Sequence, residues 1–138
     1  MDLDFALLAD AADVSMGKLY VMGGAFDTIQ VPAFPAVHPL LAVVLRLLLG
    51  PTDLDRKHTL QVLLLDADAK HIASANGELT VPKAPGSPQG WKQAVILPLR
   101  FFNVPFKETG HYSIEILVDG TLTKAIPLRV LQPPQLNQ

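Results

Sequence analysis

The sequence predicts an all-β protein, folded as an antiparallel β-sandwich of about seven to nine strands. Its 12 prolines and 9 glycines cut the 138 residues into short segments, and almost none of these has the length or period of a helix with several turns. In residues 111–131, apolar and polar side chains alternate along two runs, which is the period of two that a half-buried strand requires. In chain order we expect strands over residues 5–13, 19–22, 26–31, 40–49, 58–66, 70–81, 91–99, 111–118 and 121–131.

The first segment, residues 5–13, is expected to be a strand, although its alanines and leucines would suit a helix by propensity alone. Apolar residues recur at every second position from Phe5, and Asp10 lies on the other face. Because this is the period of a strand, we favour a strand over a helix. Residues 14–18 are then expected to be a hairpin connection into a second strand at residues 19–22.

Paired glycines, Gly23 and Gly24, interrupt the second strand. Such a pair inside a strand commonly marks a bulge or a close approach between backbones, so we assign both residues a structural role. Residues 26–31 are expected to resume the strand.

Prolines are frequent in residues 32–39, and they forbid ladder pairing at their positions because proline has no backbone N–H. This segment is therefore expected to be a crossover loop.

The segment over residues 40–49 is apolar on both faces. Leaving either face in water would forgo about 1.5 to 3 kcal/mol of burial for each large side chain, so both faces should be covered. Either the loop at residues 32–39 or a second subunit supplies the outer cover, with Arg46 as a rim charge or a paired charge. The candidate interface residues are Leu41, Val43, Leu45, Leu47 and Leu49.

The closing hairpin turns at Asp119 and Gly120. This pair predicts a type I′ turn, because both central positions need positive φ and these residues tolerate it best. Tyr112 opens the first strand of the hairpin, where sandwich proteins often place a tyrosine whose hydroxyl bonds to upstream backbone; an ordinary core tyrosine is the alternative. Both interpretations are structural. Pro127 has no backbone N–H, which predicts that the last strand lies at a sheet edge or that the proline nitrogen faces away from a paired strand.

Aromatic residues gather near the proline-rich segment 82–90, which is the predicted flexible loop. Exposed aromatic side chains beside a mobile loop suit sugar or peptide binding. Trp91, Phe101 and Phe102 are therefore candidate ligand-binding residues. Core packing is the competing explanation for these three and for Phe106, because aromatic side chains bury a large area.

No motif for catalysis, cofactor binding or metal binding rises above background, and we expect no cofactor and no metal. Two turns carry aspartates whose oxygen atoms could bind Ca²⁺, but the spacing lacks the residues of a defined calcium loop and turn initiation explains the same aspartates. The histidines lack the spacing that zinc needs, which leaves only a pair across strands such as His58 with His71. The residues concerned are Asp53, Asp55, Asp66 and Asp68, and His38, His58, His71 and His111.

Composition limits the compartment and the partners. The chain has no cysteine, which fits a reducing compartment, and its acidic start is unlike a secretory signal. The longest apolar run, residues 40–49, falls short of the ~20 residues of a spanning helix. A net charge of -2 with scattered Lys and Arg gives no basic stripe for nucleic acid. We therefore expect a cytoplasmic protein that neither inserts into a membrane nor binds nucleic acid.

Four segments together resemble a family of short, uncharacterised bacterial proteins: residues 5–12, 17–24, 110–112 and 118–120. The resemblance spans nearly the whole chain. It implies a small immunoglobulin-like β-sandwich that is encoded as a stand-alone protein, and it implies no catalytic or binding residue. We expect a single domain over residues 1–131 and a C-terminal tail over residues 132–138.

The functional prediction is a non-catalytic interaction or assembly module that uses sheet faces or edges and forms a homo-oligomer or binds another protein. An apolar content of 49% with only 17% charged residues is somewhat apolar for a monomer, which predicts that apolar surface meets another chain. The alternative is a small-molecule or carbohydrate-binding protein that uses the loop end near Trp91. An enzyme would need converging polar groups that the sequence does not show.

Overall fold

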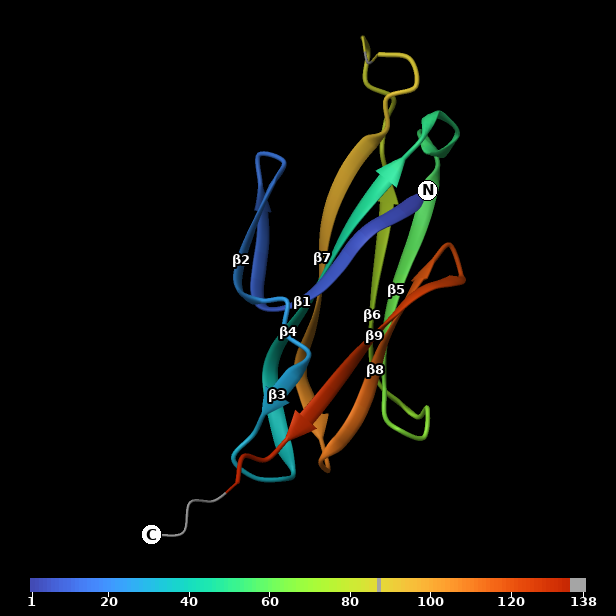
Figure 1. Ribbon diagram of the computed structural model, residues 1–138. Coiled ribbons are helices and arrows are strands. Elements are labelled where there is room, and N and C mark those ends of the chain that lie inside the picture. The colour runs from blue at the N-terminus through green and yellow to red at the C-terminus, as the bar shows by residue number, and fades with distance from the viewer. Residues whose placement is uncertain (87, 135–138) are drawn as a thin grey trace.

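The computed structural model describes residues 1–86 and 88–134, and in this part of the chain nine strands form two sheets (Figure 1). The first sheet has the order β2-β1-β4-β7, and the second has the order β3-β9-β8-β5-β6. The pairings are antiparallel except that of β3 with β9. The predicted all-β sandwich is confirmed. Its strands are β1 (Asp2–Ser15), β2 (Lys18–Gly24), β3 (Thr28–Gln30), β4 (Ala36–Leu49), β5 (Lys57–Leu65), β6 (His71–Thr80), β7 (Gln93–Phe106), β8 (Gly110–Val118) and β9 (Thr121–Leu131).

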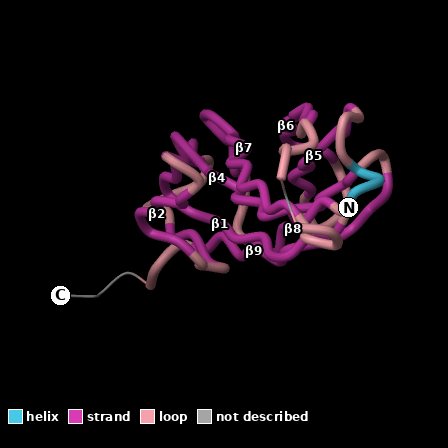
Figure 2. The backbone as a smooth tube through the Cα atoms, turned by 90° about the horizontal axis from the view of Figure 1, so that it is seen from above, coloured by secondary structure: helices cyan, strands magenta, loops and turns pink. Residues whose placement is uncertain are grey.

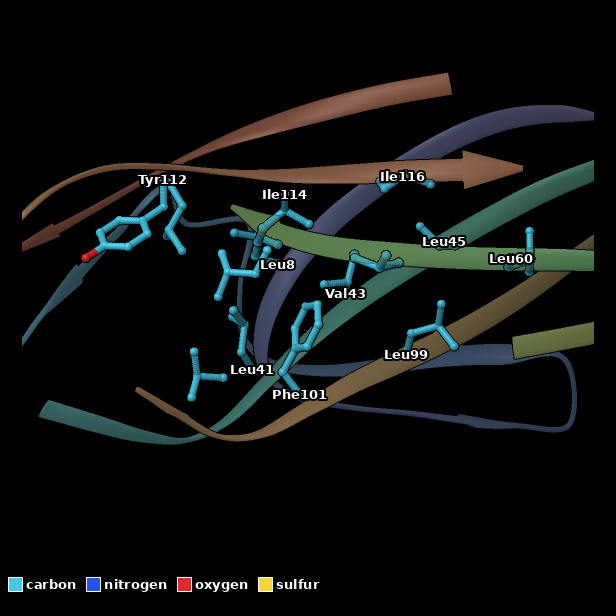
Figure 3. Packing of buried hydrophobic residues seen from close by; sticks show 14 of the residues in the cluster. Leu8, Leu41, Val43, Leu45, Leu60, Leu99, Phe101, Tyr112, Ile114 and Ile116 are labelled. Carbon is cyan, nitrogen blue, oxygen red and sulfur yellow. The ribbon is translucent and has the colours of Figure 1, made fainter. Parts of the chain in front are cut away.

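The main core lies between the two sheets. Alternate residues of the central strands point inward, and Figure 3 shows Leu41 and Val43 of β4 lying with Phe101 of β7 opposite Tyr112 and Ile114 of β8. All five side chains are buried. Each large side chain removed from water in this way stabilises the fold by about 1.5 to 3 kcal/mol, so this layer is what holds the two sheets together.

Strand β4 is longer than predicted, because it begins at Ala36 and includes Pro39. The prediction of a crossover loop over residues 32–39 is therefore wrong for the second half of that segment. Strand β4 pairs with β1 only from Ala42 onward, so one side of β4 is open at Pro39. A proline is tolerated at such a position because no neighbouring strand needs its missing N–H.

Strand β7 runs unbroken to Phe106, where we expected a strand over residues 91–99 and then a connection. It is the edge strand of its sheet. Pro98 and Pro105 lie within it and still allow the ladder with β4 to continue. At a sheet edge a proline costs the ladder nothing when its nitrogen faces away from the paired strand, and this is why prolines did not end the strand.

Strand β2 ends at Gly24, and the chain then crosses to the second sheet. The expected resumption over residues 26–31 is a three-residue strand, β3, that pairs in parallel with β9. The predicted continuation of one strand past the glycine pair is thus wrong. The glycines mark the exit from one sheet toward the other.

The closing hairpin has the predicted turn. Asp119 and Gly120 have φ angles of 50° and 80°, so both central residues are in the left-handed region that a type I′ turn requires. Strand β9 pairs with β3 only from Arg129 to Leu131. One side of β9 is therefore open at Pro127, as the sequence predicted for this residue.

The hydroxyl of Tyr112 donates a hydrogen bond of 2.6 Å to the backbone carbonyl oxygen of Glu108, four residues upstream. The predicted bond from this tyrosine to upstream backbone is confirmed. Its ring packs edge-on against Phe106, with centroids 5.0 Å apart and an interplanar angle of 79°. Burial raises the pKa of the Tyr112 phenol. Tyr112 therefore ties the loop before β8 to the core.

Replacing Tyr112 by phenylalanine is expected to lower the free energy of unfolding by about 1 kcal/mol, because one neutral hydrogen bond is lost while the ring stays in the core. Urea denaturation measures the difference. Ser74→Ala is the control, since Ser74 is exposed on β6 and the loss of its hydroxyl should change the free energy of unfolding by no more than about 0.5 kcal/mol. Equal effects of the two substitutions would argue against a stabilising bond at Glu108.

In the described part of the chain, no helix has the length and apolar character needed to cross a membrane. The predicted tail over residues 132–138 begins after β9, and residues 132–134 form no strand. Residues 135–138 of that tail, and Ser87 of the predicted loop over residues 82–90, lie outside the described residues.

Candidate interaction site

The second half of β1 and the whole of β2 form a two-stranded hairpin that we call the arm, residues 10–24. Strand β1 pairs with β4 up to Ala9 and with β2 from Ala9 to Ser15, so the arm begins where β1 leaves β4. Figure 1 shows the arm as the blue hairpin standing beside the sandwich, and in Figure 2 β2 lies far from β5 and β6. The arm is the part of the first sheet with the least cover.

A two-residue turn closes the arm. Ser15 pairs with Lys18, and Met16 and Gly17 between them have φ angles of 52° and 73°. Two consecutive positive φ angles define a type I′ turn, whose twist suits a hairpin. The hairpin connection expected at residues 14–18 is thus confirmed.

The glycine pair at the base of the arm is required by two close approaches. Gly23 has a φ of 61°, and a Cβ atom there would lie 2.3 Å from an oxygen of the Asp10 carboxylate. A Cβ atom on Gly24 would lie 2.4 Å from a methyl carbon of Val21. A side chain at either position would require a neighbouring side chain to move, and the positive φ of Gly23 disfavours other residues there, which agrees with the close approach that the sequence suggested.

One face of the arm packs onto the outer side of the first sheet. Leu19 contacts a second apolar cluster, separate from the main core. Arg100 of β7 donates a hydrogen bond of 2.7 Å to the carbonyl oxygen of Ala12 and so ties the arm to the far edge strand. The arm therefore supplies part of the outer cover of β4. The buried members of this cluster are Ala9, Ala12, Ala42 and Val44.

The opposite face of the arm exposes Tyr20 and Met22 beside the charged side chains of Asp13 and Lys18, and the turn exposes Met16. Met16, Tyr20 and Met22 are 96%, 59% and 75% exposed. Tyr20 and Met22 are two positions apart on β2, so their side chains lie on the same face. An apolar cluster that stays in water on a projecting element is typical of a contact surface.

The outer edge of β2 also carries free backbone groups. Residues flanking a two-residue turn form a hydrogen-bonded pair, and such pairs then alternate with non-hydrogen-bonded pairs along the hairpin. From Ser15 and Lys18 this alternation gives non-hydrogen-bonded positions at Leu19 and Val21. Their N–H and C=O groups therefore point away from β1, and β2 is the last strand of its sheet.

The interface predicted on β4 is wrong for the residues named. All five of those side chains have 0% exposure and belong to the main core, where they face the second sheet. No partner chain can contact them in this fold. The apolar pattern of residues 40–49 correctly predicted a strand that is covered on both faces. The face that carries these five residues is covered by the second sheet of the same chain. The residues are Leu41, Val43, Leu45, Leu47 and Leu49.

The three aromatic residues proposed for ligand binding do not form one site. Phe101 is 3% exposed and lies in the core, whereas Phe102, the next residue, is 67% exposed. Trp91 is also 67% exposed but precedes β7 at its other end. Since a strand rises about 3.3 Å per residue, Gln93 and Phe102 alone are about 30 Å apart. The predicted ligand site is therefore not assembled from these residues.

Most of the aspartates considered for Ca²⁺ have structural partners. An oxygen of Asp66 accepts bonds of 2.9 Å from the backbone N–H groups of Asp68 and Lys70, and a carboxylate oxygen of Asp53 accepts one of 2.9 Å from Gly50. The bond from Gly50 holds the pKa of Asp53 below its ordinary value. Within residues 1–86 and 88–134, no three acidic or histidine side chains lie together as a metal site would need.

One polar pair was not predicted. His58 is 1% exposed, its Nδ1 lies 2.8 Å from a carboxylate oxygen of Asp119, and its Nε2 lies 2.7 Å from the carbonyl oxygen of Asp53. Both ring nitrogens face acceptors, so the ring makes both bonds only as an imidazolium. The bonds to Asp119 and to Asp53 raise the pKa of His58, against the effect of burial. This pair joins the closing turn to the start of β5.

No curated protein matches the sequence. Among solved structures, the chain is similar to a glycosyl hydrolase family 2 member from Bacteroides cellulosilyticus DSM 14838, at 13% identity over 70% of this chain and 14% of that one, with a TM-score of 0.35. It is also similar to a beta-glucuronidase from glycoside hydrolase family 2, at 11% identity over 76% of this chain and 12% of that one, with a TM-score of 0.33. Likenesses this distant, over so small a share of each enzyme, carry no functional argument.

The sequence pattern of a family of unknown function, DUF6941, matches residues 4–131, and the chain therefore belongs to that family.

Proposed function

We propose that this protein is a non-catalytic interaction module that pairs with a second copy of itself through the open edge of β2. The observation that carries the proposal is the arm, which combines outward backbone groups at Leu19 and Val21 with exposed Tyr20 and Met22. An edge strand with free N–H and C=O groups is a ready template for another strand. The low content of charged residues, 17%, agrees with burial of apolar surface on assembly.

The two edges of the first sheet differ in how they are protected. Strand β7 carries Pro98, Arg100 and Pro105, and prolines and charges on an edge strand are devices that discourage pairing. Strand β2 has no proline, and its only charged residue, Lys18, lies at its first position. The unprotected edge is therefore the one on the arm.

Strand β2 is complementary to a second copy of itself. Two β2 strands that run antiparallel about a two-fold axis at Val21 place Tyr20 opposite Met22 of the other copy, and Lys18 opposite Gly24. No like charges meet in this register. The outward groups of Val21 in the two copies face each other as a hydrogen-bonded pair, while the tyrosine ring and the methionine sulfur make a favourable cross-strand contact. A two-fold interface of this kind is the commonest in soluble oligomers.

Light scattering at micromolar concentrations is expected to show a dimer, and Met22→Glu is expected to weaken it by tenfold or more. The new carboxylate would have to leave water beside the partner's tyrosine, and a cost of about 1.4 kcal/mol is enough for tenfold. Leu122→Glu is the matched control, because Leu122 is 54% exposed on the second sheet and its substitution should leave the dimer unchanged.

A second variant tests the backbone contribution. Val21→Pro removes an outward N–H that makes no bond within the arm, so the folded monomer should persist while dimerisation falls. A strict monomer for the unaltered protein, or a dimer that resists both Met22→Glu and Val21→Pro, would contradict pairing through β2.

A further inference from the structure

A cleft of about 410 Å³ opens at the base of the arm, between the arm and strands β3 and β4. This volume lies within the range of small-molecule sites, about 300 to 1,000 Å³. The glycine pair forms part of its wall, and Phe26 and Ile29 give it an apolar side. Its polar side chains are Asp10, Thr28, Gln30 and His38. The cleft shares Gly23 and Gly24 with β2, but all of its lining residues belong to one chain, so binding in the cleft does not require the proposed dimer.

His38 has an imidazole nitrogen that the fold leaves without a partner. Its Nε2 is shielded from solvent and accepts or donates no hydrogen bond within the described chain. A buried polar atom in this state destabilises a fold, so native proteins rarely keep one without a reason. His38 is also one of the residues that line the cleft, so a ligand bound there lies beside the residue that has the unpaired nitrogen.

Asp10 is held at the cleft by Gly23. The absence of a side chain at Gly23 leaves the space that the Asp10 carboxylate occupies, since a Cβ atom there would lie 2.3 Å from one of its oxygens. The backbone of β1 is fixed next to Asp10, because the preceding residue, Ala9, is fully buried in the second apolar cluster. Although Asp10 is exposed, the position of β1 thus places its carboxylate beside Gly23 at the cleft.

The side chains of the cleft that have no partner in the fold favour one chemical class of ligand. Thr28 is already engaged, because its hydroxyl donates to Asp27 at 2.8 Å and accepts from Arg129 at 3.1 Å. The remaining side-chain groups are the carboxylate of Asp10, the amide of Gln30 and the imidazole of His38, all of which can accept hydrogen bonds. Within the described chain no lysine or arginine lines the cleft, and the guanidinium of Arg129 that reaches Thr28 is paired with Asp27. The site is therefore rich in acceptors and carries negative charge.

We propose that this cleft binds the ammonium group of an organic amine, with Asp10 as the charged acceptor and with Gln30 and His38 completing its hydrogen bonds. An ammonium group has three donors and no acceptor, which matches the three side chains with free acceptors that line the cleft. The ring of Phe26 offers an additional surface to a cation. The amine is either a free alkylamine or the side chain of a lysine on another protein.

The test is a titration of the full chain, followed by amide chemical shifts, with cadaverine and with Nα-acetyl-lysine methylamide as separate ligands. Both should give saturable shifts at Asp10, Gly23 and Gln30, and 1,5-pentanediol, which has the same length but no charge, should give none. Tighter binding of cadaverine would assign the site to free amines, and tighter binding of the lysine derivative would assign it to a protein side chain.

Two variants and a control complete the test. Asp10→Asn should weaken amine binding by tenfold or more, and Asp13→Asn, on the same strand and exposed, should leave it unchanged. His38→Phe should weaken binding and raise the Tm, because it removes an unpaired buried nitrogen while keeping a planar ring. The proposal fails if the diol shifts the same amides as strongly as the amines, if Asp10→Asn binds like the parent, or if neither amine gives a saturable response.

Discussion

Replacing Phe106 by alanine is expected to lower the free energy of unfolding by about 4 kcal/mol, because Phe→Ala in a core costs the transfer of the ring and leaves a cavity. Phe106 has no exposed surface, and it makes the edge-on contact with Tyr112 that closes one end of the core. Chemical denaturation at fixed pH measures the loss.

Phe102→Ala is the matched control for this prediction. Phe102 lies on the same strand and is 67% exposed, so its removal should change the free energy of unfolding by no more than about 0.5 kcal/mol. Similar losses at the two positions would mean that β7 does not bury Phe106 and expose Phe102 in solution.

Raising the pH above 6.5 is expected to destabilise the fold through His58. Its pKa is raised from the ordinary value of 6.5, first by the bond to Asp119 and then by the bond to Asp53. A group with a raised folded-state pKa contributes stability that is fully present below its unfolded pKa and is lost as the pH rises through its folded pKa. The free energy of unfolding should therefore fall as the pH rises above 6.5 and through the raised folded-state pKa of His58.

Asp119 has the opposite dependence. Burial acts to raise the pKa of its carboxyl group, but hydrogen bonds from His58 and from the backbone of Thr59 outweigh burial and leave the pKa below 3.8. Its contribution is present above 3.8 and is lost as the pH falls through the lowered pKa. The pair is thus most stabilising between the two ordinary values, 3.8 and 6.5.

His58→Gln is expected to cost about 2 kcal/mol at pH 6, since bonds to charged groups contribute about 1.5 to 3 kcal/mol and Asp119 is partly screened by solvent. The variant should also lose most of the decline in stability above pH 6.5. Urea titrations at several pH values measure both effects. His111→Gln, at an exposed position, should retain the decline, and persistence of the full decline in His58→Gln would assign it to other groups.

Local features of this chain could be predicted because neighbouring residues determine them. Asp119 and Gly120 form their turn because the backbone there must have positive φ, whatever the turn packs against. Tyr112 reaches the carbonyl of Glu108 only four residues away. The turn at Met16 and Gly17 forms for the same reason, because both residues have positive φ. In each case the interacting groups are close in sequence.

The aromatic residues of β7 show where such prediction ends. Strict alternation from Phe101, which is buried, would bury Asn103, yet Val104 and Phe106 are the buried residues. Asn103 has a φ of 52°, and this departure from extended backbone shifts the alternation by one residue. Asparagine tolerates positive φ better than most residues, but an asparagine in an otherwise apolar segment does not by itself predict a shift in register, so the separation of core and surface aromatics was missed.

The sequence by itself determined that this protein is a sandwich with a tight closing hairpin and a strand that must be covered on both faces, because alternation and turn chemistry are local properties. Only the tertiary structure decided what provides the cover. The leucines of β4 face the second sheet, and the outer side of β4 meets the arm of its own chain. The partnership of His58 with Asp119 and the cleft between Asp10 and His38 likewise join residues far apart in sequence. Such long-range placement depends on the packing of the whole chain, and that packing leaves the edge of β2, rather than the face of β4, open to a partner.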